Sequence, residues 1–265
     1  MMIKANHYLI KGGALTKKQS EKITINLLSA QSASGQADKF YKGVKFSNNT
    51  DSEGRHMYPV FYIPPYNDGK KLKTILNQTP KTHILSTNMY ELEIIRLLHL
   101  LAPNNAEVDN MVEKTLKRLR TTCFGYENDG VGECFDTSII VLRFLAEVLP
   151  NDTLWIQSRI NNYNYHASEK KRPWFAKWYF WLCLSELPLE IANIEIQKYK
   201  DEILNWLYNK SCVMNSEQDK IIHPVLMSIL RNIVTKYPEY EYVKNRQPYI
   251  NEKDGRLYFD MSNEM

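Results

Sequence analysis

One short segment, residues 123–136, holds the residue types best suited to chemistry. It reads Cys-Phe-Gly-Tyr-Glu-Asn-Asp-Gly-Val-Gly-Glu-Cys-Phe-Asp, with two cysteines, three glycines and four acids. The apolar run Ile139–Leu149 that follows predicts a helix, and the dipole at a helix N-terminus favours the thiolate form of a cysteine such as Cys134. An imidazole downstream, that of His166, can take a proton from that thiol. Cys134 and His166 are therefore a candidate catalytic pair for attack on a carbonyl carbon.

A packing role explains the same residues equally simply. Cysteine is often buried and inert at the start of a core helix, and a histidine can be satisfied by backbone or water. Glu133 and Asp136 flank the Cys134 thiol and disfavour its thiolate, which predicts slow alkylation. Asp129 and Asp136 can also be explained as a turn residue and a helix cap. Both interpretations of Cys134 and His166 remain open at this stage.

Gly132-Glu133-Cys134 resembles the opening of the buried catalytic helix in transglutaminase-like cysteine enzymes. In that family a downstream strand brings a histidine back to the cysteine. The resemblance implies a strand over Thr153–Tyr165, His166 as the base, and cysteine-dependent acyl transfer. The chain departs from the family after His166, where Ala167-Ser-Glu-Lys-Lys-Arg replaces the short strand that holds an orienting Asp.

A second resemblance covers about residues 105–150. The run from Val112-Glu-Lys-Thr-Leu-Lys-Arg-Leu-Arg through Asp129-Gly130 to Asp136-Thr137-Ser138 and an apolar helix is similar to the repeat of the terpenoid cyclase and protein prenyltransferase α/α toroid. This similarity implies helical hairpins curved around a cavity. The acidic Asp-x-Asp-Asp motif that protonates polyenes in the cyclases is absent from the sequence, so cyclase chemistry is not implied.

A ligand could also be held by aromatic and acidic side chains in and near this segment. Residues 170–181 interleave cations with large rings, which suits an anionic ligand or single-stranded nucleic acid, although helical spacing favours a core role for the rings. The candidate ligand-binding residues are Tyr126, Asp129, Glu133, Asp136, Trp174 and Trp178.

The elements that must position these residues are predicted by apolar side chains at three- and four-residue spacing. They predict helices near residues 94–101, 108–119, 139–149, 174–187, 191–207 and 225–234. Asn88 with Glu91 is a possible capping pair for the first helix. Prolines at 103, 150, 188 and 238 close helices at about the spacing of two-helix repeats. The expected fold is mainly α, built from stacked helical hairpins as a helical repeat or an α/α-toroid-like array.

Composition divides the chain into three expected parts. Residues 1–80 carry twelve Lys/Arg and five Asp/Glu, a net charge of +7 that leaves −3 for the rest. We predict an irregular, glycine-containing basic arm over 1–80, with a short helix near Ile23–Leu28 and a strand or extended segment at Met57–Ile63. The helical body covers 81–238. The tail, 239–265, has an Asp254-Gly255 turn before a possible short strand, Leu257–Phe259.

The overall composition narrows the classes of function. Hydrophobic residues make up 43% and charged residues 24% of the chain, as in ordinary globular proteins. No apolar run is long enough to span a bilayer and no secretory signal is evident, so we expect a cytoplasmic protein without a membrane partner. The four cysteines lack Cys-x-x-Cys spacing, which predicts reduced thiols and no zinc or other metal or cofactor.

Three functional hypotheses follow. The first is a helical-repeat protein that holds a protein, peptide or small-molecule ligand on a concave face near the 123–136 loop. The second is a cysteine-dependent acyl-transfer enzyme that uses Cys134 and His166. The third is nucleic-acid binding through the basic arm, which we expect to be weak at most because the pI of 8.7 is only moderately basic.

Overall fold

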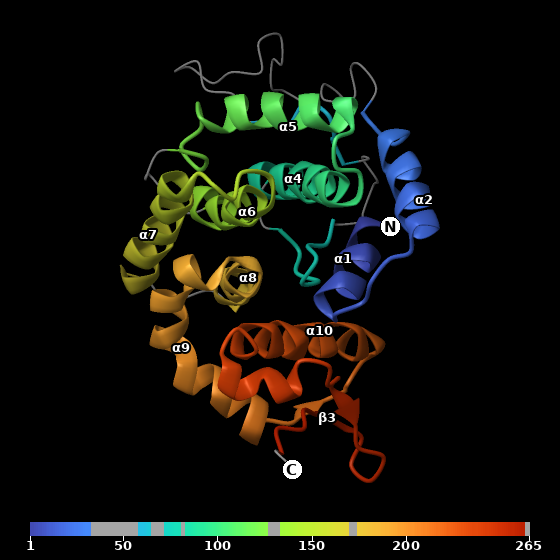
Figure 1. Cartoon of the computed structure of the whole chain (residues 1–265), viewed down its shortest axis with the longest axis vertical. Helices are drawn as coiled ribbons and strands as arrows, with labels where there is room; N and C mark the ends of the chain where they lie inside the picture. The colour runs from blue at the N-terminus through green and yellow to red at the C-terminus, as the bar shows by residue number, and fades with distance from the viewer. Residues whose placement is uncertain (33–57, 65–71, 81–82, 127–132, 170–173, 263–265) are drawn as a thin grey trace. The chain divides into compact units, whose positions relative to one another are not determined.

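The chain is mainly α-helical, in a computed structural model that describes residues 1–32, 58–64, 72–80, 83–126, 133–169 and 174–262 (Figure 1). About 66% of this described part is helical. The helices are α1 (Met2–Ile10), α2 (Lys17–Leu28), α4 (His83–Leu101), α5 (Ala106–Leu119), α6 (Glu133–Val148), α7 (Thr153–Glu169), α8 (Trp174–Glu186), α9 (Leu189–Asn209), α10 (Glu217–Val234) and the 3-10 helix η2 (Pro238–Val243). The mainly α prediction is confirmed, and the repeat or toroid arrangement stays a prediction.

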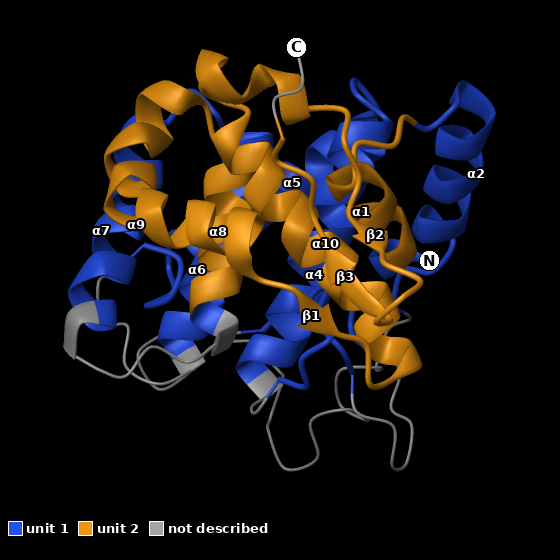
Figure 2. Cartoon of the chain, turned by 90° about the horizontal axis from the view of Figure 1, so that it is seen from below, with its two compact units in different colours: residues 1–3, 15–176 blue, residues 4–14, 177–265 orange. Residues whose placement is uncertain are grey.

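The chain forms two compact units (Figure 2). Unit 1 contains residues 1–3 and 15–176, and unit 2 contains residues 4–14 and 177–265. The change of composition near residue 80 falls within unit 1. Unit 2 therefore takes up a short segment from the start of the chain as well as its C-terminal part.

Unit 1 is organised around α4, which packs against α2, α5 and α6, while α7 packs against α6. The residues of α6 from Ile139 to Leu145 are all buried, as expected for the central helix that the apolar run predicts. Because α4 and α6 bury side chains around most of their circumference, they form the middle of this unit and the other helices cover them.

Helix starts in unit 1 agree only partly with the expected capping residues. Asn105 precedes α5, and its side-chain oxygen accepts hydrogen bonds from the backbone N–H groups of Glu107 and Val108. Asn88 and Glu91, expected as a capping pair, lie inside α4, which begins earlier at His83. The Asn88 amide instead donates to the Ile84 carbonyl oxygen at 2.9 Å. The sequence signal of a cap was wrong here because both side chains have partners in the buried interior.

Two further expectations about unit 1 are corrected. The segment Thr153–Tyr165, expected as a strand, lies in helix α7, because its buried residues recur at helical spacing: Trp155, Ile156, Arg159, Ile160 and Tyr163. Asp136, expected as a helix cap, lies inside α6, which begins at Glu133.

The N-terminal segment is more helical than predicted. Residues 2–10, expected to be irregular, form α1, and the short helix expected near Ile23–Leu28 is part of α2. Thr16 and Gln19 form a capping box at the start of α2, with each side chain bonded to the other residue's backbone N–H. Residues 58–64, expected in a strand or extended segment, form no strand and bend at Tyr58, Val60 and Phe61.

Unit 2 combines α8, α9 and α10 with a small antiparallel sheet. The strands are β1 (Cys212–Val213), β2 (Tyr249–Ile250) and β3 (Arg256–Tyr258), in the order β1-β3-β2. The strand predicted at Leu257–Phe259 corresponds to β3. Gly255 precedes it at φ +66, a left-handed conformation that favours glycine in the predicted turn.

Rings in edge-on contact pack in the interior of unit 2. The ring centroids of Trp178 and Trp181 lie 4.9 Å apart, and those of Trp178 and Trp206 lie 5.6 Å apart. Trp181 also meets Tyr199 at 6.0 Å. Trp178 is only 2% exposed, so the helical spacing of these rings reflects a core role.

None of the described helices has the length and apolarity needed to cross a bilayer.

Candidate functional site

Two reactive side chains of unit 1, those of Cys123 and Cys134, lie close together. Their Sγ atoms lie 3.2 Å apart, within reach of an S–H···S hydrogen bond in which either thiol can donate. Cys123 lies in the turn after α5, and Cys134 is the second residue of α6. The two cysteines are not joined in a disulfide. A disulfide S–S bond measures about 2.05 Å, so closing the pair moves the sulfurs together by only about 1 Å.

The two sulfurs differ in their exposure. Cys123 is buried, with 7% of its surface exposed, whereas Cys134 is half-buried. Cys134 also lies in the first turn of a helix of sixteen residues, where the positive end of the helix dipole favours a thiolate. Cys134 is therefore the sulfur more open to an external reactant.

Helix α7 holds the turn that carries Cys123. The Arg159 guanidinium donates to the carbonyl oxygens of Phe124 at 3.1 Å and Tyr126 at 2.7 Å. The Trp155 indole N–H donates to the carbonyl oxygen of Gly125 at 2.8 Å. Three consecutive carbonyl groups are thus fixed by two side chains one helical turn apart.

Glycine is the only residue type that fits at position 125 of this turn. A Cβ atom built there would lie 2.1 Å from the Leu119 carbonyl oxygen and 2.4 Å from the Thr122 hydroxyl oxygen. The backbone at Gly125 therefore passes close to the end of α5. This close approach accounts for one of the three glycines in the 123–136 segment.

Arg159 supplies a positive charge next to the buried sulfur. Its side chain is 1% exposed, and this burial lowers the guanidinium pKa to about 10, while electrostatic attraction to Cys123 acts in the opposite direction. A cation beside a sulfur stabilises the thiolate over the thiol. The charge of Arg159 therefore acts against the cost that burial imposes on a charged Cys123 sulfur.

His166 lies in the last turn of α7 and contacts the first turn of α6, which carries Cys134. Its ring meets the ring of Phe135, the residue after Cys134, at 5.9 Å between centroids. Phe135 also stacks on Tyr163 at 5.8 Å. Cys134 in α6 and His166 in α7 thus lie on neighbouring elements, both of them helices, and their pairing as a catalytic site stays a prediction. The sulfur contact that the structure adds, with Cys123, was missed.

The other candidate ligand-binding residues have different positions. Tyr126 is 53% exposed and its ring meets Trp155 edge-on at 5.8 Å, and Asp136 is half-buried in α6. Trp178 belongs to the aromatic interior of unit 2. Asp129 lies outside the described residues, as do the side chains of Glu133 and Trp174.

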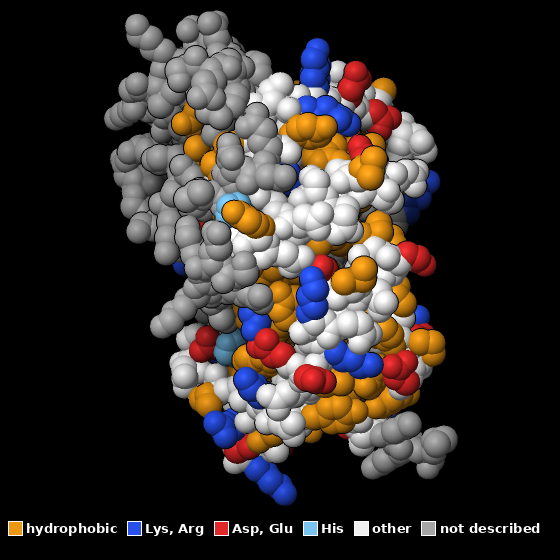
Figure 3. Space-filling model, turned by 90° about the vertical axis from the view of Figure 1, so that its left-hand side faces the viewer, with side chains coloured by type: hydrophobic (Ala, Val, Ile, Leu, Met, Phe, Trp, Pro, Cys, Tyr) orange, Lys and Arg blue, Asp and Glu red, His pale blue; other side chains and the backbone are white. Residues whose placement is uncertain are grey.

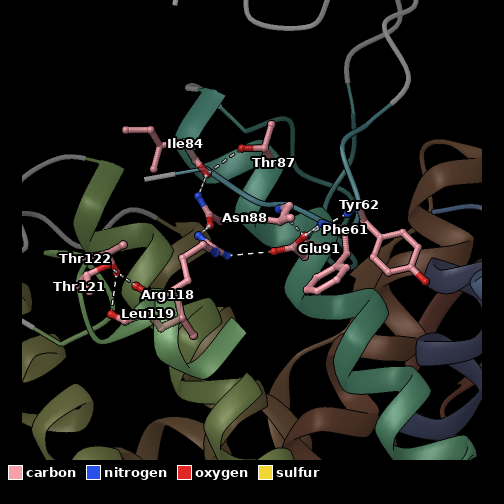
Figure 4. Close-up of polar contacts among 11 residues, drawn as sticks. Phe61, Tyr62, Ile84, Thr87, Asn88, Glu91, Arg118, Leu119, Thr121 and Thr122 are labelled. Carbon is pink, nitrogen blue, oxygen red and sulfur yellow. Dashed lines mark hydrogen bonds and ion pairs between the residues drawn. The ribbon is translucent and has the colours of Figure 1, made fainter. Parts of the chain in front are cut away.

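A second polar cluster in unit 1 surrounds Glu91 (Figure 4). One carboxylate oxygen accepts three consecutive backbone N–H groups, from Val60 at 2.9 Å, Phe61 at 2.6 Å and Tyr62 at 3.0 Å. The other oxygen accepts from Arg118 at 3.1 Å. Successive N–H groups of this kind form an anion-binding nest, which is filled here by a carboxylate of the same chain. The cluster anchors residues 58–64 to α4.

Among the described residues, charges of both signs lie close together. On the face drawn in Figure 3, Lys/Arg and Asp/Glu side chains are interspersed among hydrophobic ones. In unit 2 several lysines pair with nearby acids, such as Lys200 with Glu239 at 3.4 Å and Lys244 with Glu241 at 2.7 Å. Within the described ranges, no group of three or more His, Cys, Asp and Glu side chains is arranged to hold a metal ion.

Comparison with protein-family models, curated proteins and solved structures finds no match to this chain.

Proposed function

We propose that the protein is a thiol–disulfide redox protein in which Cys123 and Cys134 interconvert between a dithiol and a disulfide. The observation that supports this proposal most strongly is the 3.2 Å separation of their Sγ atoms. Neither sulfur needs a large displacement to form the bond. The two cysteines are also held by different elements, the turn after α5 and the first turn of α6, so the disulfide links two parts of the unit.

Oxidation of this pair removes two electrons and two protons. The S–H bonds of Cys123 and Cys134 break and one S–S bond forms. A low-molecular-weight disulfide is a suitable acceptor, because its own S–S bond is reduced to two thiols in the same exchange. The proposal therefore needs no metal or organic cofactor.

The same place on the molecule is where the sequence indicates ligand binding. Tyr126 is largely exposed next to the turn that carries Cys123. A molecule bound there would lie beside the turn that carries Cys123, the partner of Cys134. Binding of a peptide or small molecule near the 123–136 loop is thus compatible with redox exchange as the chemistry that follows.

Cysteine-dependent acyl transfer is the second candidate, and the contact between Phe135 and His166 favours it. On this hypothesis His166 takes the proton of Cys134, so a His166→Ala variant should react with iodoacetamide at Cys134 much more slowly than the unaltered protein. In the redox proposal the charge of Arg159 and the α6 dipole act on the pair, and the same substitution should change alkylation by less than about threefold. The two candidates therefore predict different results for one measurement.

The redox proposal is tested by mapping disulfides after equilibration with mixtures of reduced and oxidised dithiothreitol. We expect one reversible intramolecular bond, located by mass spectrometry between Cys123 and Cys134, and absent from Cys123→Ser and Cys134→Ser. Cys212→Ser is the matched control, because Cys212 is also half-buried but burial raises the pKa of its thiol. This control should retain the bond. The redox function would be refuted if the unaltered protein formed no Cys123–Cys134 disulfide at any ratio of reduced to oxidised dithiothreitol.

A further inference from the structure

We infer that Cys134 is the sulfur that exchanges with an external low-molecular-weight disulfide, that Cys123 is the resolving sulfur, and that Arg159 is the positioning residue for Cys123. This inference rests on the proposed redox function and gives it a direction. The distance between the two sulfurs does not distinguish them, but the inference gives each sulfur a different task.

The difference in access assigns the first step. An incoming disulfide must align its S–S bond with the attacking sulfur, which requires open space in front of that sulfur. Cys134 is half-buried at a helix start, whereas Cys123 is 7% exposed and is followed by Phe124, which is fully buried. The carbonyl of Phe124 is fixed by Arg159, so the turn cannot easily swing Cys123 outward.

The chemical steps balance as two exchanges. The Cys134 thiolate attacks one sulfur of the external disulfide, forms a mixed disulfide with it, and releases the other half as a thiolate that takes up a proton. The Cys123 thiolate then attacks the Cys134 Sγ, 3.2 Å away in the reduced pair. The second half of the external disulfide leaves as a thiolate and takes up a proton. Both cysteines are oxidised, and one external disulfide becomes two thiols.

Arg159 acts in the second step through the charge of Cys123. The attacking sulfur must be a thiolate, and in the reverse direction the same sulfur must leave as one. The buried guanidinium of Arg159 attracts this charge and, through the carbonyl oxygens of Phe124 and Tyr126, keeps the turn in place. The first step, attack of Cys134 on the external disulfide, does not need the charge of Arg159 on Cys123.

The first experiment treats the reduced full-length chain with hydroxyethyl disulfide and follows adducts by intact mass and peptide mapping. Cys123→Ser should accumulate one mercaptoethanol adduct on Cys134, and Cys134→Ser should react at Cys123 at least about tenfold more slowly. The unaltered chain should pass to the internal disulfide without a lasting adduct.

The outcomes separate the order of the sulfurs from the redox function. Equal or faster reaction of Cys123 in the Cys134→Ser chain overturns the order, even if the unaltered chain forms its disulfide. If the Cys123→Ser chain traps the adduct on Cys134 but the unaltered chain never closes, the redox function and the resolving role of Cys123 fail, while the access of Cys134 is supported.

The role of Arg159 is tested by timing the two steps separately. Arg159→Lys retains the positive charge, and its closure from mixed to internal disulfide should stay within about threefold of the unaltered chain. Arg159→Gln should close at least about tenfold more slowly, while adduct formation on Cys134 changes by less than about threefold. A merely structural role would not split the two steps in this way. The assignment is overturned if a folded Arg159→Lys chain closes slowly, or if the Lys and Gln variants close at the same rate. If the Gln variant does not fold, the closure rate of the Lys variant still decides.

Discussion

The interiors of the two units are stabilised by different kinds of side chain. Unit 1 buries charged groups, and those that are at most 6% exposed include Glu91, Glu93, Arg118, Arg143 and Arg159. Unit 2 buries a group of aromatic rings, including Trp178, Phe180, Trp181 and Tyr199, and fewer charged groups, among them Glu195 and Arg231. Both interiors exclude water, but they differ in how far each buried side chain depends on one particular partner.

A charged interior depends on every partner being present. A buried charge that loses its partner keeps the cost of its desolvation, whereas a ring that loses one neighbour keeps most of its other contacts. Unit 1 should therefore tolerate single substitutions poorly, but it can hold a cation such as Arg159 against a sulfur. The dithiol lies in the unit whose interior already contains paired charges.

The largest effect should come from Glu91→Ala in unit 1. This change leaves Arg118 without its carboxylate and removes the acceptor of three backbone N–H groups. We expect a loss of about 3–5 kcal/mol in the free energy of unfolding, measured by urea denaturation. The control is Glu217→Gln, at an exposed pair with Lys220, which should change stability by less than about 1 kcal/mol. A loss below about 1 kcal/mol for Glu91→Ala would remove the distinction between the two interiors.

A similar loss, but a recoverable one, is expected at the buried pair of Arg143 and Glu93. Each side chain is 1% exposed, and Arg143 donates to the Glu93 carboxylate. Arg143→Met alone should cost about 3–5 kcal/mol, because the Glu93 charge remains buried. Adding Glu93→Leu should restore most of that loss, since apolar groups of similar volume can replace a buried pair. A double variant no more stable than the single one would show that the charge itself is not the source of the cost.

A smaller effect is expected from Trp181→Phe in unit 2. Trp181 is fully buried, and its indole N–H has no hydrogen-bond acceptor among the described residues. Phenylalanine removes that N–H and leaves a modest cavity, so the expected loss is about 1–2 kcal/mol, against about 3–5 kcal/mol for Trp181→Ala. Thermal unfolding of the two variants measures the difference. If the Phe variant were as unstable as the Ala variant, the aromatic interior would be as strict as the charged one.

The smallest effect should be the same in both units. The Thr16 hydroxyl caps α2 in unit 1, and the Ser216 hydroxyl caps α10 in unit 2 through the N–H of Asp219. Replacing either residue with alanine should cost about 1 kcal/mol, because exposed caps do not sense the composition of the interior. Circular dichroism melts of both variants provide the comparison, and a difference above about 1 kcal/mol would extend the contrast to the surface.

Several helices were readable from the sequence because each buries a stripe of side chains at regular spacing, as α5 and α9 do. The local spacing of residues does not identify a contact partner that lies far away in the sequence. Asn88 and Glu91 have the residue types of a cap, but their partner Arg118 lies 30 and 27 positions away. The capping interpretation was therefore reasonable locally and wrong in the folded chain.

The candidate site was predictable to a similar extent. A cysteine at a helix start and a histidine on the next element are local features, and both were found for Cys134 and His166. The strand expected between them followed from a family resemblance, whereas the spacing of Trp155, Arg159 and Tyr163 already favoured a helix. The pairing of Cys123 with Cys134 depends on how α5 and α6 pack on α4, which no short window of sequence reports. Two cysteines that bracket one glycine-containing loop were the available signal.

The bond between the end of α1 and α10 sets the order in which the chain can assemble during translation. The Ile10 carbonyl oxygen accepts from Asn232 at 2.9 Å, a contact that spans 222 positions. Ribosomes add residues from the N-terminus, so α1 emerges before α10 and must wait for this partner until Asn232, 222 positions later, has been added. Most of unit 1 can begin folding while unit 2 is still being synthesised. For that interval the carbonyl groups at the end of α1 remain accessible to water and to chaperones.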